Sequence, residues 1–462
     1  MSDKTDIIVF GATGFTGRLI TEYLATHPQK ALFSLGVAAR SESKLRGVLQ
    51  ELGLGESGIR TVTLDVTDPD SVERAVKAAR VVVNTVGPYW RWGTPVVRSC
   101  VRNNVHYVDL TGEGCWIHEL ITQFDWLATK NHTVIIPSCG YDSIPSDISA
   151  HLAVKTLHEH VAANHPDILA SVGHVGLSTS ISAHRLKTGI SGGTLASFIT
   201  AIEEVPPELR KISGNPFFIS PIKGTPLPFP KLVYSLPIPG GNPIVGSFFV
   251  MRPSNAAIVH RTAGLIELQA RTARSKLHQD PKLEIQRYGT SFAYDEFLAG
   301  PSKFSAFFSS ISLIFGLLLV RLFKPLRRLI LQKMPSGSGP SIDQKETGYL
   351  HLTNISTSAD IPSLPPVKVK TDVKIKGDPG YYKTAVMISE SALSLLLPPP
   401  SAPSHVKENY NPFDALPSMA REGGILTPMT ALGDVLIQRL RDTGSFEFSS
   451  SVVQDPEDRK RI

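Results

Sequence analysis

The sequence contains little cysteine, and the three residues present form no recognisable pattern. Among 462 residues, Cys100, Cys115 and Cys139 form no Cys-x-x-Cys pair and do not lie at metal-ligand spacing from a histidine. Three thiols cannot all pair, so we expect reduced cysteines in an intracellular compartment and no metal centre. The first six residues are polar, and no apolar signal core precedes the first apolar run. A cleaved secretory signal is therefore not expected.

The sequence also lacks the signatures of several functional classes. Lys and Arg exceed Asp and Glu by six, and outside 321–333 they are scattered, so we expect no nucleic-acid partner. No Walker loop, His-Glu-x-x-His or Gly-x-Ser-x-Gly is present, which excludes the simplest phosphotransferases, zinc hydrolases and serine hydrolases. No tyrosine has a lysine four residues on, so the proton-transfer pair of short-chain dehydrogenases is absent.

The first 150 residues alternate apolar runs with amphipathic stretches. The runs are too uniformly apolar for strands with one solvated face, so they predict a parallel sheet covered by helices on both sides. We predict strands at 7–10, 32–39, 61–64, 81–85, 106–110 and 133–136, and helices at 15–24, 42–52, 70–79, 95–104 and 119–130. This is an α/β fold with a Rossmann-type doubly wound sheet, whose ligand lies at the carboxyl ends of the strands.

A glycine-rich turn, GATGFTG at 11–17, follows the first apolar run. Such a turn directs backbone N–H groups and the positive end of the next helix at a pyrophosphate. Its glycines permit the tight turn, the approach of the phosphates and close packing of the helix on the sheet. We therefore predict a dinucleotide site with contacts from Gly11, Ala12, Thr13, Gly14, Phe15 and Gly17.

The ends of the second and third predicted strands bear on which dinucleotide binds. The second strand ends in Ala39-Arg40-Ser41, without the Asp or Glu that would hold a ribose 2′-hydroxyl. Arg40, with Lys44 one turn on, fits a 2′-phosphate and favours NADP over NAD; the alternative is a solvated surface arginine. Asp65, after the third strand, either meets the adenine end of the cofactor or only forms a turn.

Two later loops are candidates for the nicotinamide end of the site and for catalysis. The fourth strand ends in a Gly-Pro turn that would bring backbone under the cofactor, with predicted contacts from Asn84, Gly87 and Pro88. Tyr89 either donates a hydrogen bond to a substrate oxygen or packs in the core. After the sixth strand, Asp142 is a candidate proton donor or substrate-orienting group, and the alternative is that the local carboxylates cap the next helix.

Five motifs follow one another along the first 150 residues: GATGFTGR at 11–18, AAR at 38–40, NTVGPYW at 84–90, HYVDLTGE at 106–113 and CGYDSIPSD at 139–147. Together they resemble the saccharopine dehydrogenase-like oxidoreductases, a family that includes bacterial trans-acting enoyl reductases. The resemblance extends to SGGT at 191–194, DPGY at 378–381 with Thr384 and Ala385, and GGILTP at 423–428. It implies a Rossmann domain, a nicotinamide cofactor and a discontinuous second domain. True saccharopine reductases carry a different Gly-x-x-Pro-Gly substrate loop, which disfavours an amino-acid substrate.

The uncharged segment 304–320, FSAFFSSISLIFGLLLV, lies between Lys303 and Arg321. As a helix it would be roughly 25 Å long, short of the ~30 Å hydrocarbon core of a bilayer. Its large apolar residues would share one helical face and its serines another, and interleaved basic residues follow. This pattern is typical of an interfacial anchor on a lipid droplet or on the cytoplasmic face of a membrane. A buried core helix and a true span are the alternatives.

The second half is less regular, because most of the 35 prolines lie there. Strands are predicted at 173–180, 350–356 and 367–376, the last two as exposed-edge or antiparallel strands, with helices at 194–204 and 382–396. The proline-rich stretch 206–242 is predicted to be a lid or linker. The domain prediction is a Rossmann domain at 1–150, a second α+β domain at 151–300 and 345–440, a membrane-associating segment at 301–333, and a frayed polar tail at 441–462.

These patterns predict an NADP-dependent oxidoreductase at a membrane or lipid-droplet surface. It would reduce a carbonyl or enoyl group of a hydrophobic small molecule or lipid, and a homodimer is considered. One alternative is a non-catalytic NADP-binding sensor or membrane scaffold. The other is a saccharopine-type amino-acid dehydrogenase, a soluble protein in which 304–320 would be buried.

Overall fold

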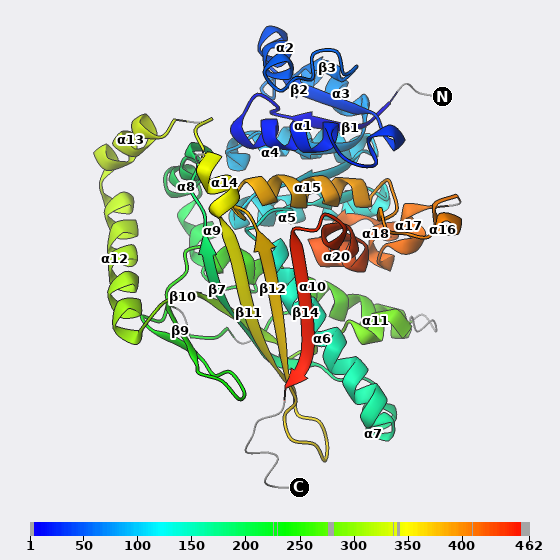
Figure 1. Cartoon of the computed structure of the whole chain (residues 1–462), viewed down its shortest axis with the longest axis vertical. Coiled ribbons are helices and arrows are strands. Elements are labelled where there is room, and N and C mark those ends of the chain that lie inside the picture. The colour runs from blue at the N-terminus through cyan, green and yellow to red at the C-terminus, as the bar shows by residue number, and fades with distance from the viewer. Residues whose placement is uncertain are drawn as a thin grey trace.

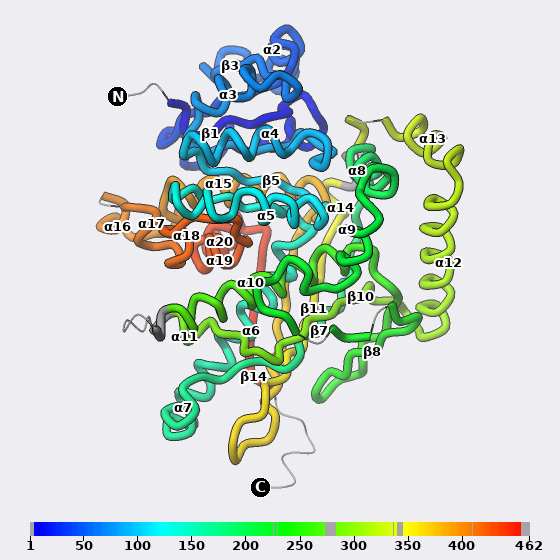
Figure 2. Tube along the Cα trace, turned by 180° about the vertical axis from the view of Figure 1, so that it is seen from behind, coloured from blue at the N-terminus to red at the C-terminus, as the bar shows by residue number. Residues whose placement is uncertain are grey.

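The computed structural model describes residues 4–224, 226–228, 230–275, 281–335, 337–339, 342–408 and 410–453. Within them the chain forms two sheets of seven strands each, packed together with their helices (Figure 1 and Figure 2). One sheet is entirely parallel and the other is mixed. The predicted α/β class, with a Rossmann-type sheet and a second α+β domain, is confirmed.

The parallel sheet has the strand order β3-β2-β1-β4-β5-β6-β13. Its first six strands follow the doubly wound order, so a ligand site is expected where the order reverses, at the carboxyl ends of β1 and β4. The strands are β1 (Thr5–Phe10), β2 (Leu35–Ala39), β3 (Arg60–Thr63), β4 (Ala79–Asn84), β5 (His106–Asp109), β6 (Val134–Ile136) and β13 (Gly424–Ile425). The connecting helices are α1 (Phe15–Ala25), α2 (Glu42–Glu51), α3 (Pro69–Lys77), α4 (Tyr89–Arg102) and α5 (Gly114–Lys130), with a 3₁₀ turn at Lys30–Leu32.

The C-terminal part of the chain completes this sheet. Helix α15 (Tyr382–Ser394) packs against α1, β4 and β5, and β13 pairs with β6. Figure 1 shows α15 between α1 and the second sheet. Two segments more than 200 residues beyond the predicted 1–150 domain therefore belong to the same layered unit.

The second sheet has the order β14-β12-β11-β7-β10-β9-β8. Only the β7–β10 pair is parallel among the described strands of this sheet. The strands are β7 (Leu177–Lys187), β8 (Tyr234–Leu236), β9 (Ile244–Ser247), β10 (Ala293–Ala299), β11 (Tyr349–Ser358), β12 (Lys368–Lys376) and β14 (Phe446–Val453). Helices α6 (Ile144–Asn164) and α10 (Arg252–Ser275) pack against one face of it.

The remaining helices surround the two sheets. They are α7 (Pro166–Val172), α8 (Gly192–Glu203), α9 (Pro207–Ile212), α11 (Pro281–Ile285), α12 (Lys303–Leu322), α13 (Lys324–Lys333), α14 (Ile342–Thr347), α16 (Ser404–Glu408), α17 (Pro412–Ala415), α18 (Ser418–Glu422), α19 (Pro428–Ala431) and α20 (Gly433–Asp442). Helix α12 stands at the edge of the molecule, beside the second sheet (Figure 1). By length and composition it is the one helix of the described residues that could cross a membrane, with mean hydropathy 1.9 and 11% of its apolar window buried.

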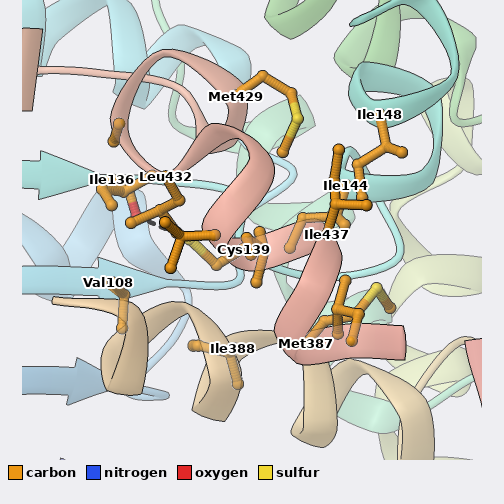
Figure 3. Packing of buried hydrophobic residues seen from close by; sticks show 14 of the residues in the cluster. Val108, Ile136, Cys139, Ile144, Ile148, Met387, Ile388, Met429, Leu432 and Ile437 are labelled. Carbon is orange, nitrogen blue, oxygen red and sulfur yellow. Dashed lines mark hydrogen bonds between the residues drawn. The ribbon is translucent and has the colours of Figure 1, made fainter. Parts of the chain in front are cut away.

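A common apolar core joins the two halves of the chain (Figure 3). Buried side chains from the parallel sheet, α6, α15, α19 and α20 meet there, among them Val108, Ile136, Ile144, Ile148, Met387, Ile388, Met429, Leu432 and Ile437. Because α6 also covers the second sheet, the two sheets share one hydrophobic interior.

Helix α4 starts six residues before the predicted helix 95–104. The prediction placed Pro95 in the first turn, where proline is favoured, but Pro95 lies inside the helix. The Glu113 carboxylate accepts hydrogen bonds from the backbone N–H groups of Tyr89 and Trp90, at 2.9 and 2.8 Å. A side chain from the loop after β5 thus caps α4, and local sequence carries no signal of this.

The predicted frayed tail is wrong for Phe446–Val453, which form the edge strand β14. This strand pairs with β12 at eight positions, and Phe446 is buried. Its alternate residues Glu447 and Ser449 are exposed, because one face of an edge strand meets solvent. Polar composition here reflects a half-solvated strand. The predicted strands at 350–356 and 367–376 are antiparallel, as expected, but lie inside the sheet.

Candidate functional site

The glycine-rich loop between β1 and α1 has room for backbone but not for side chains. Gly11 has a φ of +82°, and a Cβ there would lie 2.7 Å from Thr85 Oγ1. A Cβ on Gly17 would lie 2.3 Å from the Gly11 carbonyl oxygen. Gly14, the N-cap of α1, offers no side-chain hydrogen bond to the first turn, which leaves that turn for an anionic ligand. The loop therefore fits a dinucleotide pyrophosphate.

The other predicted loop residues take different positions. Ala12 is buried, whereas Thr13 is half-buried. The Phe15 ring contacts Tyr381 and Tyr382 edge to face, with centroids 5.9 and 6.2 Å apart. Phe15 therefore joins the glycine-rich loop to the start of α15.

Arg40 and Asp65 end neighbouring strands of the sheet. Arg40 is exposed after β2, and Asp65 follows β3. Hydrogen bonds from the Thr67 backbone and hydroxyl lower the pKa of Asp65, and the positive charge of Arg40 lowers it further. These hydrogen bonds show that Asp65 forms a turn, while its contact with the adenine end of a cofactor stays a prediction.

The loop after β4 carries the other predicted cofactor contacts. Asn84 is fully buried, and its amide donates to Tyr107 Oη and accepts from the Val86 N–H, both at 3.0 Å. The Asn84 side chain thus holds the loop after β4 through hydrogen bonds inside the protein. Gly87 is exposed and Pro88 half-buried, joined by a cis peptide bond. The predicted cofactor contact at this turn falls on exposed backbone at Gly87, and it stays a prediction.

Tyr89 turns its hydroxyl inward. Its ring is 4% exposed and stacks on Trp116 with centroids 5.3 Å apart. Tyr89 Oη donates to the Asn84 carbonyl oxygen at 3.0 Å. Burial and the Asp109 charge raise the pKa of Tyr89 well above its ordinary value. These contacts match the packing alternative, since the hydroxyl hydrogen is already used within the protein.

Asp142 lies at the same carboxyl edge of the sheet, two strands along from β4, in the loop between β6 and α6. It is half-buried, and its Oδ2 would be 3.3 Å from a Cβ added to the exposed Gly112. Burial and then the negative charge of Glu296 raise the pKa of Asp142 to about 6. Among the described residues no hydrogen bond reaches its carboxylate, and Ser143, not Asp142, is the N-cap of α6. The carboxyl group is therefore placed to exchange a proton near neutral pH.

Two segments of the second half complete the site, and sequence reasoning did not place them there. The Ser191 N–H donates to Tyr381 Oη at 2.6 Å, and Thr194 Oγ1 lies 2.8 Å from the same oxygen. Tyr381 also contacts Phe15 of the glycine-rich loop. The motifs at 191–194 and 378–381 are visible in the sequence, but only the fold shows that they meet at the cofactor loop.

Thr384 fixes the loop that carries Asp142. Its Oγ1 accepts the Tyr141 N–H at 3.0 Å, and its methyl would lie 3.0 Å from a Cβ on Gly140. A side chain at Gly140 would therefore crowd Thr384, so the loop packs closely against α15. The start of α15 therefore contacts both the phosphate end of the site, through Tyr381, and the Asp142 loop, through Thr384.

Comparisons with known proteins agree with this architecture. Residues 7–135 match the family described as Saccharopine dehydrogenase NADP binding domain. A Mycobacterium tuberculosis protein with the provisional name of a trans-acting enoyl reductase is 29% identical over 459 residues, covering 95% of this chain and 96% of its own. The trans-acting enoyl reductase of Mycobacterium bovis is 28% identical over 454 residues, with the same two coverages.

A solved structure of apo saccharopine dehydrogenase (L-Glu forming) from Saccharomyces cerevisiae also aligns with the chain. The alignment covers 97% of this chain and 100% of the yeast chain, with a TM-score of 0.47 and 13% sequence identity.

Proposed function

Because residues 7–135 match the family described as Saccharopine dehydrogenase NADP binding domain, we propose that the protein reduces an enoyl or carbonyl group of a lipid-like substrate at a membrane or lipid-droplet surface. The family match confirms the predicted NADP cofactor. Together with the relatives, it confirms the resemblance stated from the motifs and the oxidoreductase class. The names of the relatives support the enoyl group in particular.

The observation that carries the proposed chemistry is the half-buried Asp142 carboxyl group at the carboxyl edge of the parallel sheet. Bound NADPH would supply a hydride, so the reduction also needs a proton, which an acidic side chain at the site can supply. With a pKa of about 6, Asp142 holds its proton in about half of the molecules at pH 6 and in roughly a tenth at pH 7, which is enough for a general acid. Tyr89 is a weaker candidate, since its hydroxyl hydrogen is bonded to the Asn84 carbonyl.

For an enoyl substrate the proposed step balances as follows. The β carbon receives the hydride, and the electron pair of the double bond moves toward the carbonyl oxygen to give an enolate. The Asp142 proton then goes to the α carbon as the enolate collapses, which leaves a saturated acyl group and an Asp142 carboxylate. Solvent then restores the proton on Asp142 before the next turnover.

The exposed side of α12 supports a lipid-like substrate and a membrane location. Large apolar side chains there face solvent, including Phe304, Phe307, Phe308, Ile311, Phe315, Leu318 and Leu322. A protein surface rarely exposes such a contiguous apolar patch without a partner. The neighbouring α13 carries Lys324, Arg328 and Lys333, which would suit anionic headgroups.

The contacts of α12 favour attachment along the surface over a span. Its opposite side packs on the protein, where Ser310 Oγ accepts from Phe248 N–H at 2.9 Å and donates to the Leu232 carbonyl at 2.7 Å. Arg327 of α13 bonds to Glu203 of α8 at 2.8 Å and to carbonyl oxygens at the end of α12. A helix tied to the protein on one side is suited to inserting only its other side into a lipid surface.

The test is NADPH oxidation with trans-2-octenoyl and trans-2-hexadecenoyl thioesters of N-acetylcysteamine, in buffer and in mixed vesicles. We expect turnover to increase with chain length and with vesicles. Asp142→Asn should bind NADPH normally but lose turnover, whereas Gly14→Asp should lose both. Turnover of an amino acid and its oxo-acid partner instead would support the saccharopine-type alternative. NADPH binding without turnover of any enoyl or carbonyl substrate would support the sensor.

A further inference from the structure

A chain of three buried polar side chains runs behind the Asp142 loop. Tyr141 Oη lies 3.1 Å from His184 Nδ1, and His184 Nε2 lies 3.1 Å from Glu296 Oε2. The three side chains come from the loop after β6, from β7 and from β10, so the chain connects the cofactor domain to the second sheet. Tyr141 is 4% exposed, and the other two are fully buried.

Three further donors surround the Glu296 carboxylate. Ser146 Oγ and Tyr294 Oη donate to Oε2 at 2.8 Å each, and Asn255 Nδ2 donates to Oε1 at 2.7 Å. Burial alone would raise the pKa of Glu296, but His184 and the hydrogen bonds from Ser146 and Tyr294 outweigh it, so the pKa lies below its ordinary value. Glu296 is therefore an ionised carboxylate in the interior.

Net stability is a weak explanation for such a cluster. A buried ion pair usually contributes little net free energy of folding, because the desolvation cost offsets the attraction, and apolar replacements of similar volume are often as stable. Tyr141 and Tyr294 of this cluster belong to the largest apolar core of the described residues. A role in the neighbouring site is the alternative explanation that the geometry offers.

We propose that Glu296 and His184, acting through Tyr141, are positioning residues for proton transfer: they fix the loop that carries Asp142 and place the Glu296 carboxylate behind it. The proposal rests on the proposed function, in which Asp142 gives the proton. Tyr141 precedes Asp142 directly, its ring is held by His184, and its N–H is held by Thr384. The loop is thus fixed at both its backbone and its side chain.

The charge of Glu296 acts on Asp142 by repulsion. An ionised carboxylate nearby disfavours a second one, so Asp142 keeps its proton at higher pH than it otherwise would. The other titratable groups that interact with the Asp142 carboxylate are the phenols of Tyr89, Tyr141 and Tyr381, from three different elements. Their pKa values all lie above the ordinary value, chiefly because they are buried, so they stay neutral. Glu296, which His184 faces at 3.1 Å, is the acidic group among these whose charge adds to burial in raising the pKa of Asp142.

The first experiment measures the protonation of Asp142 directly. Infrared difference spectra between pH 4 and 9, with Asp142→Asn as the reference, isolate the protonated carboxyl band of Asp142. We expect Glu296→Gln to lower the midpoint of this band by about one pH unit, because the repelling charge is gone. Glu296→Asp keeps the charge and should retain the midpoint. Ser149→Ala, a buried hydroxyl on α6 that does not contact Glu296, is the matched control.

The second experiment uses the enoyl thioester assay. The high-pH limb of kcat should move down with the infrared midpoint in Glu296→Gln, while NADPH affinity and KM stay unchanged. Tyr141→Phe keeps the Glu296 charge but removes the hydroxyl that holds the loop, so the infrared midpoint of Asp142 should not change. The kcat should fall at least about tenfold, which corresponds to a loss of about 1.4 kcal/mol in transition-state stabilisation.

An unchanged Asp142 midpoint in a folded Glu296→Gln variant would overturn the proposal. So would an equal shift in Ser149→Ala, since general damage to the core would then explain both. If wild-type protein fails to reduce any enoyl or carbonyl substrate, the proposed function is wrong, while the infrared titration still decides whether Glu296 controls Asp142.

Discussion

The carbonyl oxygen of Gly11 limits which residues the cofactor loop tolerates. A Cβ on Gly17 would lie 2.3 Å from it, whereas a Cβ on Gly14 would lie 3.3 Å away. We expect Gly17→Ala to displace α1 from the loop and to lower NADPH affinity at least about tenfold, or about 1.4 kcal/mol. Isothermal titration calorimetry with NADPH measures the loss.

Gly47 provides the matched control for this substitution. It lies inside α2, and nothing lies within 4 Å of an added Cβ. Gly47→Ala should leave NADPH affinity unchanged and stabilise the helix by ~0.5–1 kcal/mol, because alanine loses less backbone freedom on folding. If Gly17→Ala binds NADPH like wild type, the loop does not hold the pyrophosphate.

Arg40 is the residue on which the preference for NADPH should depend. Its exposed guanidinium can reach a 2′-phosphate, which NADH lacks. We expect Arg40→Ala to weaken NADPH binding about tenfold to a hundredfold, the loss of one charged hydrogen bond, and to leave NADH binding unchanged. Competitive titration of the two nucleotides measures the ratio.

The control for Arg40 is a neighbouring arginine with the same charge. Arg46 lies on α2 and pairs with Glu42 at 2.7 Å, one turn before it. Arg46→Ala should change both nucleotide affinities equally and slightly, through the long-range field alone. Equal losses for NADH and NADPH in Arg40→Ala would mean that another group recognises the 2′-phosphate.

At the scale of the element, the exposed apolar side of α12 is predicted to bind a lipid surface. We expect Phe308→Glu and Phe315→Glu each to reduce binding to vesicles with anionic lipid by more than about tenfold, since a buried aromatic ring contributes roughly 1.5–3 kcal/mol. Both side chains are more than half exposed, at 53% and 58%, so the fold should not change. Vesicle flotation measures binding, and thermal unfolding measures stability.

Trp126→Glu on α5 is the control, because this ring is 73% exposed and lies on a different element. It should bind vesicles like wild type. The buried-core alternative for 304–320 does not match the exposed side of α12. If the two α12 variants bind vesicles like wild type, another protein surface and not a lipid surface covers this side. High salt should weaken wild-type binding, because the basic residues of α13 contribute electrostatically.

The elements of the parallel sheet could be predicted from sequence because their signals are local. Apolar runs, the N-cap Asp68 before Pro69 and the glycine-rich turn each act within a few residues. The apolar side of α12 could be predicted for the same reason. The edge strand β14 could not be predicted, because its pairing with β12 determines it. The early start of α4 could not be predicted either, because the distant Glu113 carboxylate caps this helix.

In the candidate site, too, local features could be predicted from the sequence and long-range contacts could not. The loops after β1, β2, β4 and β6 were predicted, because a doubly wound sheet brings its strand ends to one edge. Tyr381, Thr384, His184 and Glu296 were not placed there, because they reach the site from β7, β10 and α15 through contacts that span up to 243 residues of sequence. Such long-range contacts follow from tertiary packing and leave no periodic pattern.

At the scale of the whole molecule, a buried ion cluster ties the first helix to the last ones. The Glu390 carboxylate of α15 bonds to His27 at 2.9 Å and to Arg439 of α20 at 2.7 Å. Tyr23 of α1 also donates to it. The cluster holds the cofactor domain and the C-terminal helices together, so we expect the two to unfold in one transition.

Glu390→Gln should therefore destabilise the whole protein. Burial would raise the pKa of Glu390, but Arg439 and His27 outweigh it and the pKa lies below its ordinary value. Its stabilising effect is present above about pH 4.3, the unfolded value, and is lost as pH falls through the folded pKa. We expect a loss of about 3–5 kcal/mol at pH 7, typical of breaking a buried pair, and a smaller one at pH 4. Glu42→Gln, in an exposed pair, should cost less than about 1 kcal/mol.

Asp147 should show the opposite pH dependence. This buried carboxyl group of α6 accepts the Met429 N–H at 3.1 Å, and burial raises its pKa to about 7. Between about pH 4 and 7 the unfolded chain releases this proton while the folded protein retains it, so stability falls as pH rises. Asp147→Asn removes the buried charge and should raise Tm by a few degrees at pH 8 but not at pH 4. Thermal unfolding of wild type and both variants from pH 4 to pH 8 measures how the Tm difference of each variant changes with pH. If the Tm differences of Glu390→Gln and Asp147→Asn change with pH in the same direction, Glu390 is not a paired ion or Asp147 is not a protonated acid.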